Sequence, residues 1–172
     1  MNNTTTQIKQ RTNPNDKFYT PISLVKLHLK KFQDVIKDDE IIYEPFYGIG
    51  NYYNEMKNLY PTAIIKYTEI DLGLDFFEFN EKVDYIISNP PYSLIDKVLE
   101  YSVKLKPKII SYLIGLMNLT TKRIEYMNKK NYYVMDIHFT KVYKWFGMSV
   151  IISFSNEITE NKISFDRIVH KL

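Results

Sequence analysis

Residues 84–93 read DYIISNPPYS, an apolar run that ends at two consecutive prolines. The apolar part predicts a strand, and the spacing of apolar residues after Ser93 predicts a helix. Proline has no N–H to donate and holds the residue before it out of the α region, so the connecting loop is rigid. Two acceptors remain on it, the Asn89 side-chain oxygen and the Pro90 carbonyl. They suit a planar amino group, and Tyr92 adds an aromatic face beside them.

The same strand-to-helix pattern repeats along the chain. Apolar runs predict strands at 40–45, 63–70, 83–88, 108–117, 132–139 and 149–155. Helical spacing predicts helices at 19–36, 51–60, 93–105 and 120–131. The first of these helices begins with Thr20 as N-cap and Pro21 as first helical residue. Strands that alternate with helices predict an α/β fold with a mostly parallel sheet covered on both faces.

The last two predicted strands are too close in sequence for a crossover helix. About seven residues, 140–146, separate them, so we expect a C-terminal hairpin that adds one antiparallel strand to the sheet. The chain has 172 residues, too few for two ordinary domains, and 18–156 are predicted to form a single domain. We expect 1–17 to be a mobile arm, and 157–172 to be an extension that adds an edge strand or packs loosely.

The composition excludes several kinds of site. The chain has no cysteine, and its three histidines, His28, His138 and His170, lack metal-ligand spacing, so no metal site is predicted. A net charge of +3 and a pI near 8.8 permit a nucleic-acid partner without requiring one. No window approaches the length of apolar sequence that a membrane span needs. We therefore expect a soluble, cytoplasmic protein with no membrane partner.

Two further loops follow predicted strands, and ligands of open α/β sheets bind at such loops. In EPFYGIGN, residues 44–51, Gly48 and Gly50 let the backbone turn tightly and approach a ligand before the next helix. The following strand ends in TEID, where Glu69 or Asp71 can accept hydrogen bonds from a ribose diol. For Glu69 taken alone, a solvated strand end is the favoured interpretation, because acidic residues are common at loop ends.

Shortly after this strand, LDFFEF places a carboxylate beside an aromatic residue. The Asp75 carboxylate could accept a hydrogen bond, and the Phe76 ring offers an aromatic surface that would suit an adenine ring. A buried phenylalanine is also common in a core, and for Phe76 taken alone this structural reading is favoured over the functional one.

Taken in order, EPFYGIG, TEID, LDFFEF and SNPPYS resemble the motifs of S-adenosylmethionine-dependent amino methyltransferases of the N6-adenine type. The resemblance covers residues 18–153, and NPPY together with the glycine turn is its most specific part. The upstream FYTP is similar to the segment that, in this family, closes over the methionine part of the cofactor. The resemblance implies a Rossmann-like class I methyltransferase fold, the cofactor S-adenosyl-L-methionine, and methyl transfer to the N6 amino group of adenine in DNA.

The resemblance also implies roles for individual residues. The cofactor would be held by Tyr19, Thr20, Pro21, Glu44, Pro45, Phe46, Gly48, Gly50, Glu69, Asp71, Asp75, Phe76 and Asn89. The catalytic group would be Asn89, Pro90, Pro91 and Tyr92, with the first two holding the target amino group and Tyr92 stacking on the target base. In KVYKWFG, Phe146 would be the second aromatic against the flipped base, with Trp145 behind it.

Basic residues are expected near the same edge of the sheet. The hairpin must turn where NPPY sits, so Lys141 and Lys144 would face the substrate. The segment NLTTKR follows the fifth strand onto this edge, which makes Lys122 and Arg123 candidate phosphate contacts. A solvated helix start explains these two residues equally well.

The chain departs from the family pattern in two places. Between Glu69 and Asp75 there is no room for a helix, so a third strand, if one exists, must follow a turn. No segment has the size of a target-recognition region, so specificity is short, supplied by loops, or supplied by a protein partner or a homodimer. The alternatives are methylation of RNA adenine, N-methylation of glutamine in a protein, and a catalytically silent subunit with this fold.

Overall fold

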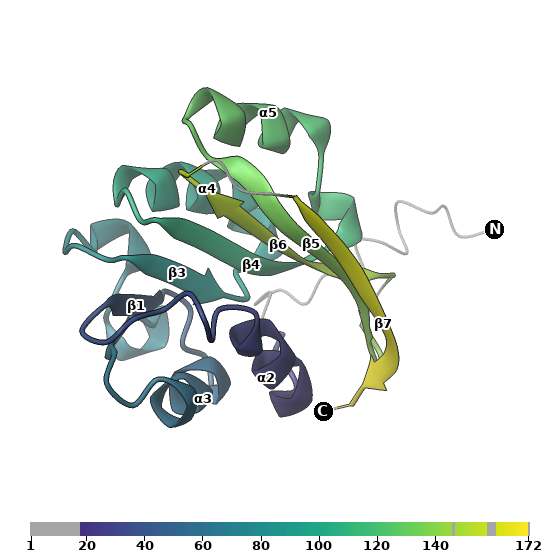
Figure 1. Cartoon of the computed structure of the whole chain (residues 1–172), viewed down its shortest axis with the longest axis horizontal. Coiled ribbons are helices and arrows are strands. Elements are labelled where there is room, and N and C mark those ends of the chain that lie inside the picture. Colours follow the sequence, from purple (N-terminus) through teal and green to yellow (C-terminus); the bar gives the residue numbers. More distant parts are fainter. Residues whose placement is uncertain (1–17, 146, 158–160, 172) are drawn as a thin grey trace.

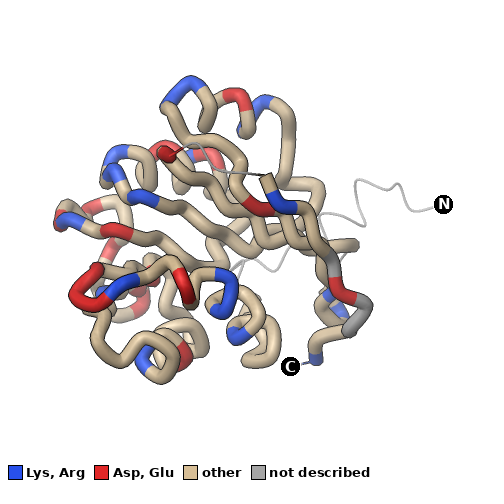
Figure 2. The backbone as a smooth tube through the Cα atoms, in the orientation of Figure 1, with Lys and Arg blue, Asp and Glu red and all other residues tan. Residues whose placement is uncertain are grey.

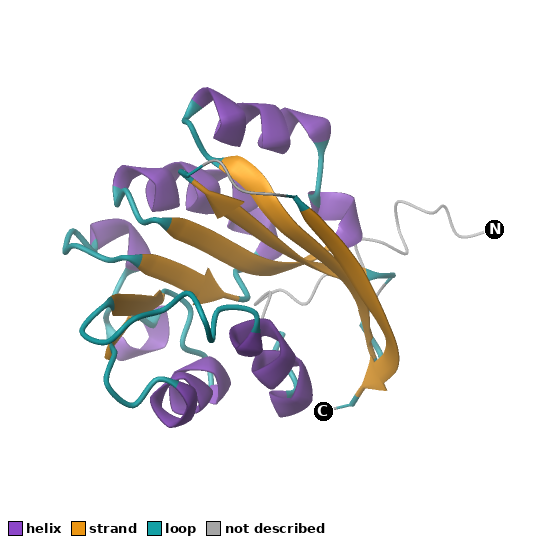
Figure 3. Cartoon of the chain, in the orientation of Figure 1, coloured by secondary structure: helices purple, strands orange, loops and turns teal. Residues whose placement is uncertain are grey.

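The computed structural model describes residues 18–145, 147–157 and 161–171. The arm predicted at 1–17 and Phe146 lie outside these ranges. The described chain is a twisted seven-stranded sheet with helices on both faces (Figures 1 and 3).

A single strand of the sheet runs against the others. The strands are β1 Ile41–Glu44, β2 Ile64–Tyr67, β3 Tyr85–Ser88, β4 Ile109–Gly115, β5 Tyr133–Val142, β6 Ser149–Ser155 and β7 Lys162–His170. Their order is β2-β1-β3-β4-β6-β5-β7. Strand β6 pairs antiparallel with β4 and β5, and every other pair is parallel. The predicted fold, a mostly parallel sheet with one antiparallel strand from a hairpin, is confirmed.

Helices cover the two faces in pairs. They are α2 Ile22–Lys30, α3 Asn51–Leu59, α4 Ile95–Lys104 and α5 Thr121–Lys129. Helices α2 and α3 pack on one face, and α4 and α5 on the other (Figure 1). Successive residues of a strand point to opposite faces, so Ile42 belongs to the core under α2 and α3 while Tyr43 belongs to the core under α4 and α5. The strands are apolar because both of their faces are buried.

Helix α2 differs from its predicted bounds at both ends. Pro21 is the N-cap rather than the first helical residue, so the helix starts one position later than expected. It also ends at Lys30 instead of continuing to residue 36. From Phe32 onward the backbone hydrogen bonds tighten into turns, which bury the Phe32 ring and leave Val35 39% exposed. Burial of one aromatic ring therefore overrides the apolar spacing that predicted a longer helix.

No additional strand lies between β2 and β3 in the part of the chain described. Two short 3₁₀ helices, η1 Ile70–Leu72 and η2 Phe76–Glu78, fill the connection to β3, and β2 remains the edge of the sheet. An isolated bridge between Glu69 and Leu74 closes the turn between them. The short 3₁₀ helices η1 and η2 stand in this connection where a longer helix or a further strand would otherwise lie.

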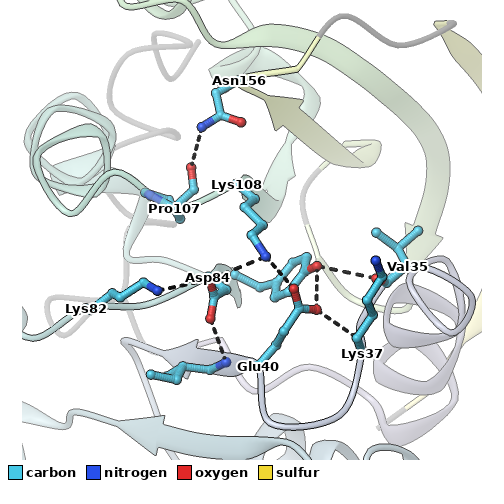
Figure 4. Close-up of polar contacts among 10 residues, drawn as sticks. Val35, Lys37, Glu40, Lys82, Asp84, Pro107, Lys108 and Asn156 are labelled. Carbon is cyan, nitrogen blue, oxygen red and sulfur yellow. Dashed lines mark hydrogen bonds and ion pairs between the residues drawn. The ribbon is translucent and has the colours of Figure 1, made fainter.

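Charged side chains link the residues just before three strands, at the end of the sheet where these parallel strands begin (Figure 4). Lys108, just before β4, forms ion pairs with Glu40, before β1, and with Asp84, before β3. Tyr85 also donates a hydrogen bond of 2.8 Å to Glu40. Burial alone would raise the pKa of Glu40, but hydrogen bonds from Lys108, the Lys37 N–H and Tyr85 outweigh it, and the pKa lies below its usual range.

The described surface carries mixed charge. Figure 2 shows Lys and Arg interspersed with Asp and Glu over most elements. Within residues 18–171, apart from the short gaps, no helix is long and apolar enough to cross a bilayer.

Candidate active site

The loops after β1, β3 and β5 meet at one edge of the sheet, because these strands are parallel to one another. The segment leading into α2 runs across this edge and is tied to two of the loops. The Asn51 side-chain amide donates to the Thr20 carbonyl at 2.8 Å, and the Asn89 amide donates to the Phe18 carbonyl at 2.6 Å. Three motifs that lie far apart in sequence are therefore neighbours.

The glycine turn after β1 depends on left-handed backbone. Gly48 has φ +56° and Gly50 has φ +83°, conformations that side chains disfavour. A Cβ on Gly50 would lie 2.7 Å from the Tyr47 hydroxyl, and one on Gly48 would touch the Tyr19 ring. The half-exposed Tyr19 ring thus lies over the turn. Glycine is required at both positions because the backbone turns tightly there and a side chain would press against the Tyr19 or Tyr47 ring.

Glu44 is a fully buried carboxyl at the end of β1. Its Oε1 accepts hydrogen bonds from the Phe46 N–H at 3.1 Å and from the Ser88 hydroxyl. Its Oε2 is buried and has no hydrogen-bond partner among the described residues. Burial, opposed by the bonds from Ser88 and Phe46 and reinforced by the Glu69 carboxylate, raises the pKa of Glu44 to about 8. A cationic group placed at Oε2 would fill a vacant hydrogen-bonding position and favour the ionised form.

Glu69 bridges the glycine turn and the loop after β2. Its Oε2 accepts a 2.6 Å hydrogen bond from the Gly48 N–H, and its Oε1 accepts one of 3.2 Å from the Asp71 N–H. Asp71 itself lies exposed in η1. Of the two carboxylates predicted for a ribose, Glu69 is the one attached to the glycine turn.

The next two predicted residues have different surroundings. The Asp75 carboxylate accepts from the Phe77 N–H at 2.8 Å and thereby caps η2. Phe76 is only 3% exposed, and its ring packs against Phe46 and Tyr101, each at a centroid distance of 5.1 Å. A ring so covered has little surface for an adenine, so the structure places Phe76 in the core, the structural alternative noted above.

Only one of the two polar atoms of the Asn89 amide has a hydrogen-bond partner among the described residues. Its Nδ2 donates to the Phe18 carbonyl, which determines which way the amide points. Its Oδ1 is buried and has no hydrogen-bond partner within the described ranges. Pro90 is buried, and Pro91, half-buried, accepts from the Leu94 N–H at 3.1 Å and starts the 3₁₀ helix η3 Tyr92–Leu94. The rigid proline loop thus holds a hydrogen-bond acceptor, Asn89 Oδ1, that receives no hydrogen bond from the described residues.

Aromatic rings lie beside this acceptor. The Phe18 ring is stacked on the Tyr92 ring, with a centroid distance of 5.9 Å and an interplanar angle of 18°. Trp145, in the loop after β5, meets the Phe18 ring edge-on at 5.6 Å. Trp145 therefore contacts the Phe18 ring beside the NPPY loop, whereas Phe146 lies outside the described residues.

Among the predicted basic residues, Arg123 is bonded to other residues of the protein. Arg123 forms an ion pair with Asp96 at 2.7 Å and donates to the Asn118 carbonyl at 2.7 Å, and only 19% of its side chain is exposed. Arg123 thus links α4 to the start of α5, and its predicted phosphate contact stays a prediction. Lys122 and Lys144 are exposed. Lys144 lies 5.5 Å above the Tyr143 ring.

Two residues of this site were not identified from the sequence as site residues. Ser88 precedes Asn89 and donates to Glu44, so it joins the glycine-turn side of the site to the NPPY loop. A lone hydroxyl at the end of a buried apolar strand was the signal available for it. Phe18 was seen as part of FYTP, but its stack on Tyr92 is a long-range contact without a local signal. Among the described residues, no cluster of His, Asp or Glu could hold a metal ion.

Comparisons with known proteins point to one fold. No family model matches the sequence, and no curated protein matches it. The solved Mtq2–Trm112 complex from E. cuniculi, responsible for methylation of the eRF1 translation termination factor, has TM-score 0.63 and 13% identity over 83% of this chain and 99% of that chain. A type I restriction-modification methyltransferase subunit from Streptococcus thermophilus has TM-score 0.61 and 12% identity over 86% of this chain and 47% of that one.

A third solved structure, precorrin-6y C5,15-methyltransferase from Geobacter metallireducens GS-15, has TM-score 0.58 and 14% identity over 77% of this chain and 87% of that chain. These three proteins modify different kinds of substrate, and their identities to this chain are low. What they share with it is the sheet and its helices. The chain therefore has the fold of class I methyltransferases.

Proposed function

We propose that this protein transfers a methyl group from S-adenosyl-L-methionine to the N6 amino group of adenine in DNA. The observation that carries the proposal is Asn89, whose oriented and buried Oδ1 has no donor among the described residues. A buried hydrogen-bond acceptor without a donor costs free energy of folding. The presence of Asn89 Oδ1 at the edge of the sheet where ligands of open α/β folds bind therefore supports a role in binding an N–H group.

The residues around the glycine turn fit the proposed cofactor. The vacant, buried Glu44 Oε2 suits the ammonium group of its methionine part. The turn at Gly48 and Gly50, with the Tyr19 ring over it, permits close approach of a ligand to the backbone. Glu69, which accepts hydrogen bonds from the Gly48 and Asp71 N–H groups, would hold the ribose, and Asp75 would hold the adenine of the cofactor. When bound, this cofactor supplies a methyl group on a positively charged sulfur.

The NPPY loop would prepare the amino group for transfer. An exocyclic amine is a weak nucleophile because its lone pair is delocalised into the ring. If Asn89 Oδ1 and the Pro90 carbonyl accept its two N–H bonds, the nitrogen becomes pyramidal and its lone pair points at the methyl group. A carbon–nitrogen bond forms as the carbon–sulfur bond breaks, and the nitrogen then releases one proton to water. Tyr92 would hold the base in plane while this happens.

A base inside a duplex cannot reach this loop. The proposal therefore includes either a flipped adenine or a single-stranded substrate. RNA adenine meets the same chemical requirement. So does a glutamine side-chain amide, since it also presents a planar NH₂ group, and the E. cuniculi complex acts on a protein factor. Exposed Lys122 and Lys144 favour a phosphate-bearing substrate over a protein.

The test is transfer of labelled methyl to four substrates: double-stranded DNA, single-stranded DNA, RNA and a protein extract. We expect label in N6-methyladenine of DNA, and a loss of about 100-fold or more in Asn89→Ala, the size of effect seen when one transition-state hydrogen bond is removed. Asn128→Ala, at an exposed position near the end of α5, is the matched control and should retain full activity.

A cofactor-binding measurement separates the chemistry from folding. Asn89→Ala should still show a rise in melting temperature with S-adenosylhomocysteine, because Glu44 and the glycine turn are unchanged. Label in glutamine, or transfer by Asn89→Ala at the wild-type rate, would contradict the proposal.

A further inference from the structure

The Ser88 hydroxyl connects the strand that carries the NPPY loop to the carboxyl group of Glu44. Ser88 is the last residue of β3, directly before Asn89, and it is fully buried. Its hydroxyl donates a hydrogen bond to Glu44 Oε1, at the end of the neighbouring strand β1. A single side chain on β3 therefore contacts the group that is proposed to hold the cofactor.

Two donors share the Oε1 atom of Glu44. Besides the Ser88 hydroxyl, the Phe46 N–H donates to this oxygen at 3.1 Å, from the loop after β1. Because the two donors come from different elements, together they fix the orientation of the carboxyl group. A carboxylate oxygen accepts about two hydrogen bonds, so Oε1 has none left to accept. The oxygen left for a ligand is Oε2, which is buried and has no partner among the described residues.

The Ser88 hydroxyl also favours the charged form of Glu44. Burial raises the pKa of Glu44 to about 8, and the hydrogen bonds from Ser88 and the Phe46 N–H act against this rise. The N–H belongs to the backbone and is present in every variant. Ser88 is thus the donor that a substitution can remove.

Other ionisable groups lie around Glu44 in the part of the chain that the structure describes. They are Glu69, after β2, and three buried tyrosines, Tyr43 on β1, Tyr52 on α3 and Tyr112 on β4. Tyrosine ordinarily ionises near pH 10, and burial raises the pKa of all three, so they stay neutral below pH 9. The Glu69 carboxylate raises the pKa of Glu44, and a substitution at Ser88 leaves it in place.

We propose that Ser88 is a positioning residue for the cofactor, whose hydroxyl orients the Glu44 carboxylate so that Oε2 accepts the ammonium group of the methionine part. This inference rests on the proposed function and deepens it, because it gives the strand before the NPPY loop a role in cofactor binding. Ser88 acts through Glu44 and does not itself contact the reacting atoms.

The affinity for S-adenosylhomocysteine, measured by calorimetry on the full chain at several pH values from 6.5 to 9, tests this role. We expect Ser88→Ala to weaken binding about tenfold or more at pH 6.5, because a hydrogen bond to a charged group is lost. The deficit should shrink towards pH 9, where Glu44 ionises without help from Ser88. Ser88→Cys, with a side chain of similar size and a weak donor, should show the same pH-dependent loss.

Two controls separate this role from a general effect on packing. Ser153→Ala removes another fully buried strand hydroxyl, which bonds to the Ser111 hydroxyl at 2.7 Å, and it should leave the affinity and its pH profile unchanged. In a Glu44→Gln protein, which has no carboxyl to orient or ionise, adding Ser88→Ala should change the affinity less than about threefold, and equally at every pH.

The outcomes distinguish this inference from the proposed function. A wild-type protein that does not bind S-adenosylhomocysteine at any pH would overturn both. If the wild-type protein binds and Ser88→Ala and Ser88→Cys bind equally well at every pH, the role of Ser88 alone is wrong. A loss that is the same at every pH, or that persists undiminished in the Glu44→Gln protein, would show a structural effect and would likewise overturn the inference.

Discussion

At the scale of single residues, Glu44 is a carboxyl group removed from water. It is fully buried, one of its oxygens has no partner among the described residues, and its pKa is raised by burial to about 8. In the unfolded chain an ordinary Glu ionises near pH 4.3. Between these two pH values the folded protein therefore keeps a proton that the unfolded chain has released.

The first prediction concerns stability. Because the folded state binds more protons than the unfolded state between about pH 4.3 and 8, Glu44 lowers the free energy of unfolding as pH rises through this window. Glu44→Gln removes the titration. We expect the variant to gain stability relative to wild type by up to about 1.4 kcal/mol for each pH unit. Urea unfolding of both proteins at several pH values between 5 and 8 measures this, and parallel pH profiles would refute it.

The second prediction concerns the cofactor site. A cation beside Glu44 favours the ionised carboxylate, so binding should expel its proton at pH values below about 8. We expect the affinity for S-adenosylhomocysteine to rise from pH 6 to pH 8, with proton release at pH 7. Calorimetry in two buffers of different ionisation enthalpy detects the released proton. Glu44→Gln should bind more weakly and without proton release, and proton release that persists in it would assign the proton to another group.

At the scale of elements, the glycine turn between β1 and α3 depends on the backbone conformation and the space at its glycines. Gly50 has φ +83°, and a Cβ there would overlap the Tyr47 ring. Gly73, at the end of η1, has φ +76° with open space around it. The two positions therefore share the same backbone requirement and differ in the room available for a side chain.

The third prediction compares these glycines. Gly73→Ala should cost about 1 kcal/mol of stability, from the left-handed backbone alone. Gly50→Ala should cost more, because Tyr47 packs against Tyr53 and Tyr67 and must shift to make room. Only Gly50→Ala should also reduce the thermal shift produced by S-adenosylhomocysteine. Equal losses of stability in the two variants would mean that Tyr47 moves aside freely.

Elements that depend on local chemistry were predictable from the sequence. Proline and glycine restrict or free the backbone by themselves, so the rigid NPPY loop and the turn at Gly48 and Gly50 could be recognised. The end of α2 at Lys30 could not, because it follows from burial of Phe32 against distant strands. The same holds for Arg123, whose partner Asp96 lies on another helix. Long-range contacts of this kind leave no periodicity in the sequence.

At the scale of the whole molecule, the site and the C-terminal strand are separate parts of the fold. The described site residues come from 18–145, at the carboxyl edge of the sheet. Strand β7 lies beyond β5 at the far edge (Figure 1). It is tied to its neighbours by buried histidines. His138 of β5 bonds to Ser164 at 2.7 Å and Asp166 at 3.0 Å, and His170 bonds to Ser23 of α2 at 2.8 Å.

The fourth prediction follows from this separation. A chain truncated after Asn156 loses β7, which pairs with β5 and supplies both hydrogen-bond partners of His138, and this loss should lower the free energy of unfolding by more than about 2 kcal/mol. The glycine turn, Glu44 and Asn89 do not contact β7 in the hydrogen bonds described. The truncated protein should therefore melt at a lower temperature and still be stabilised by S-adenosylhomocysteine as strongly as the full chain. Thermal unfolding with and without this ligand measures both effects. An unchanged melting temperature would show that β7 adds no stability, whereas a folded protein that no longer responds to the ligand would make the C-terminal extension part of the site.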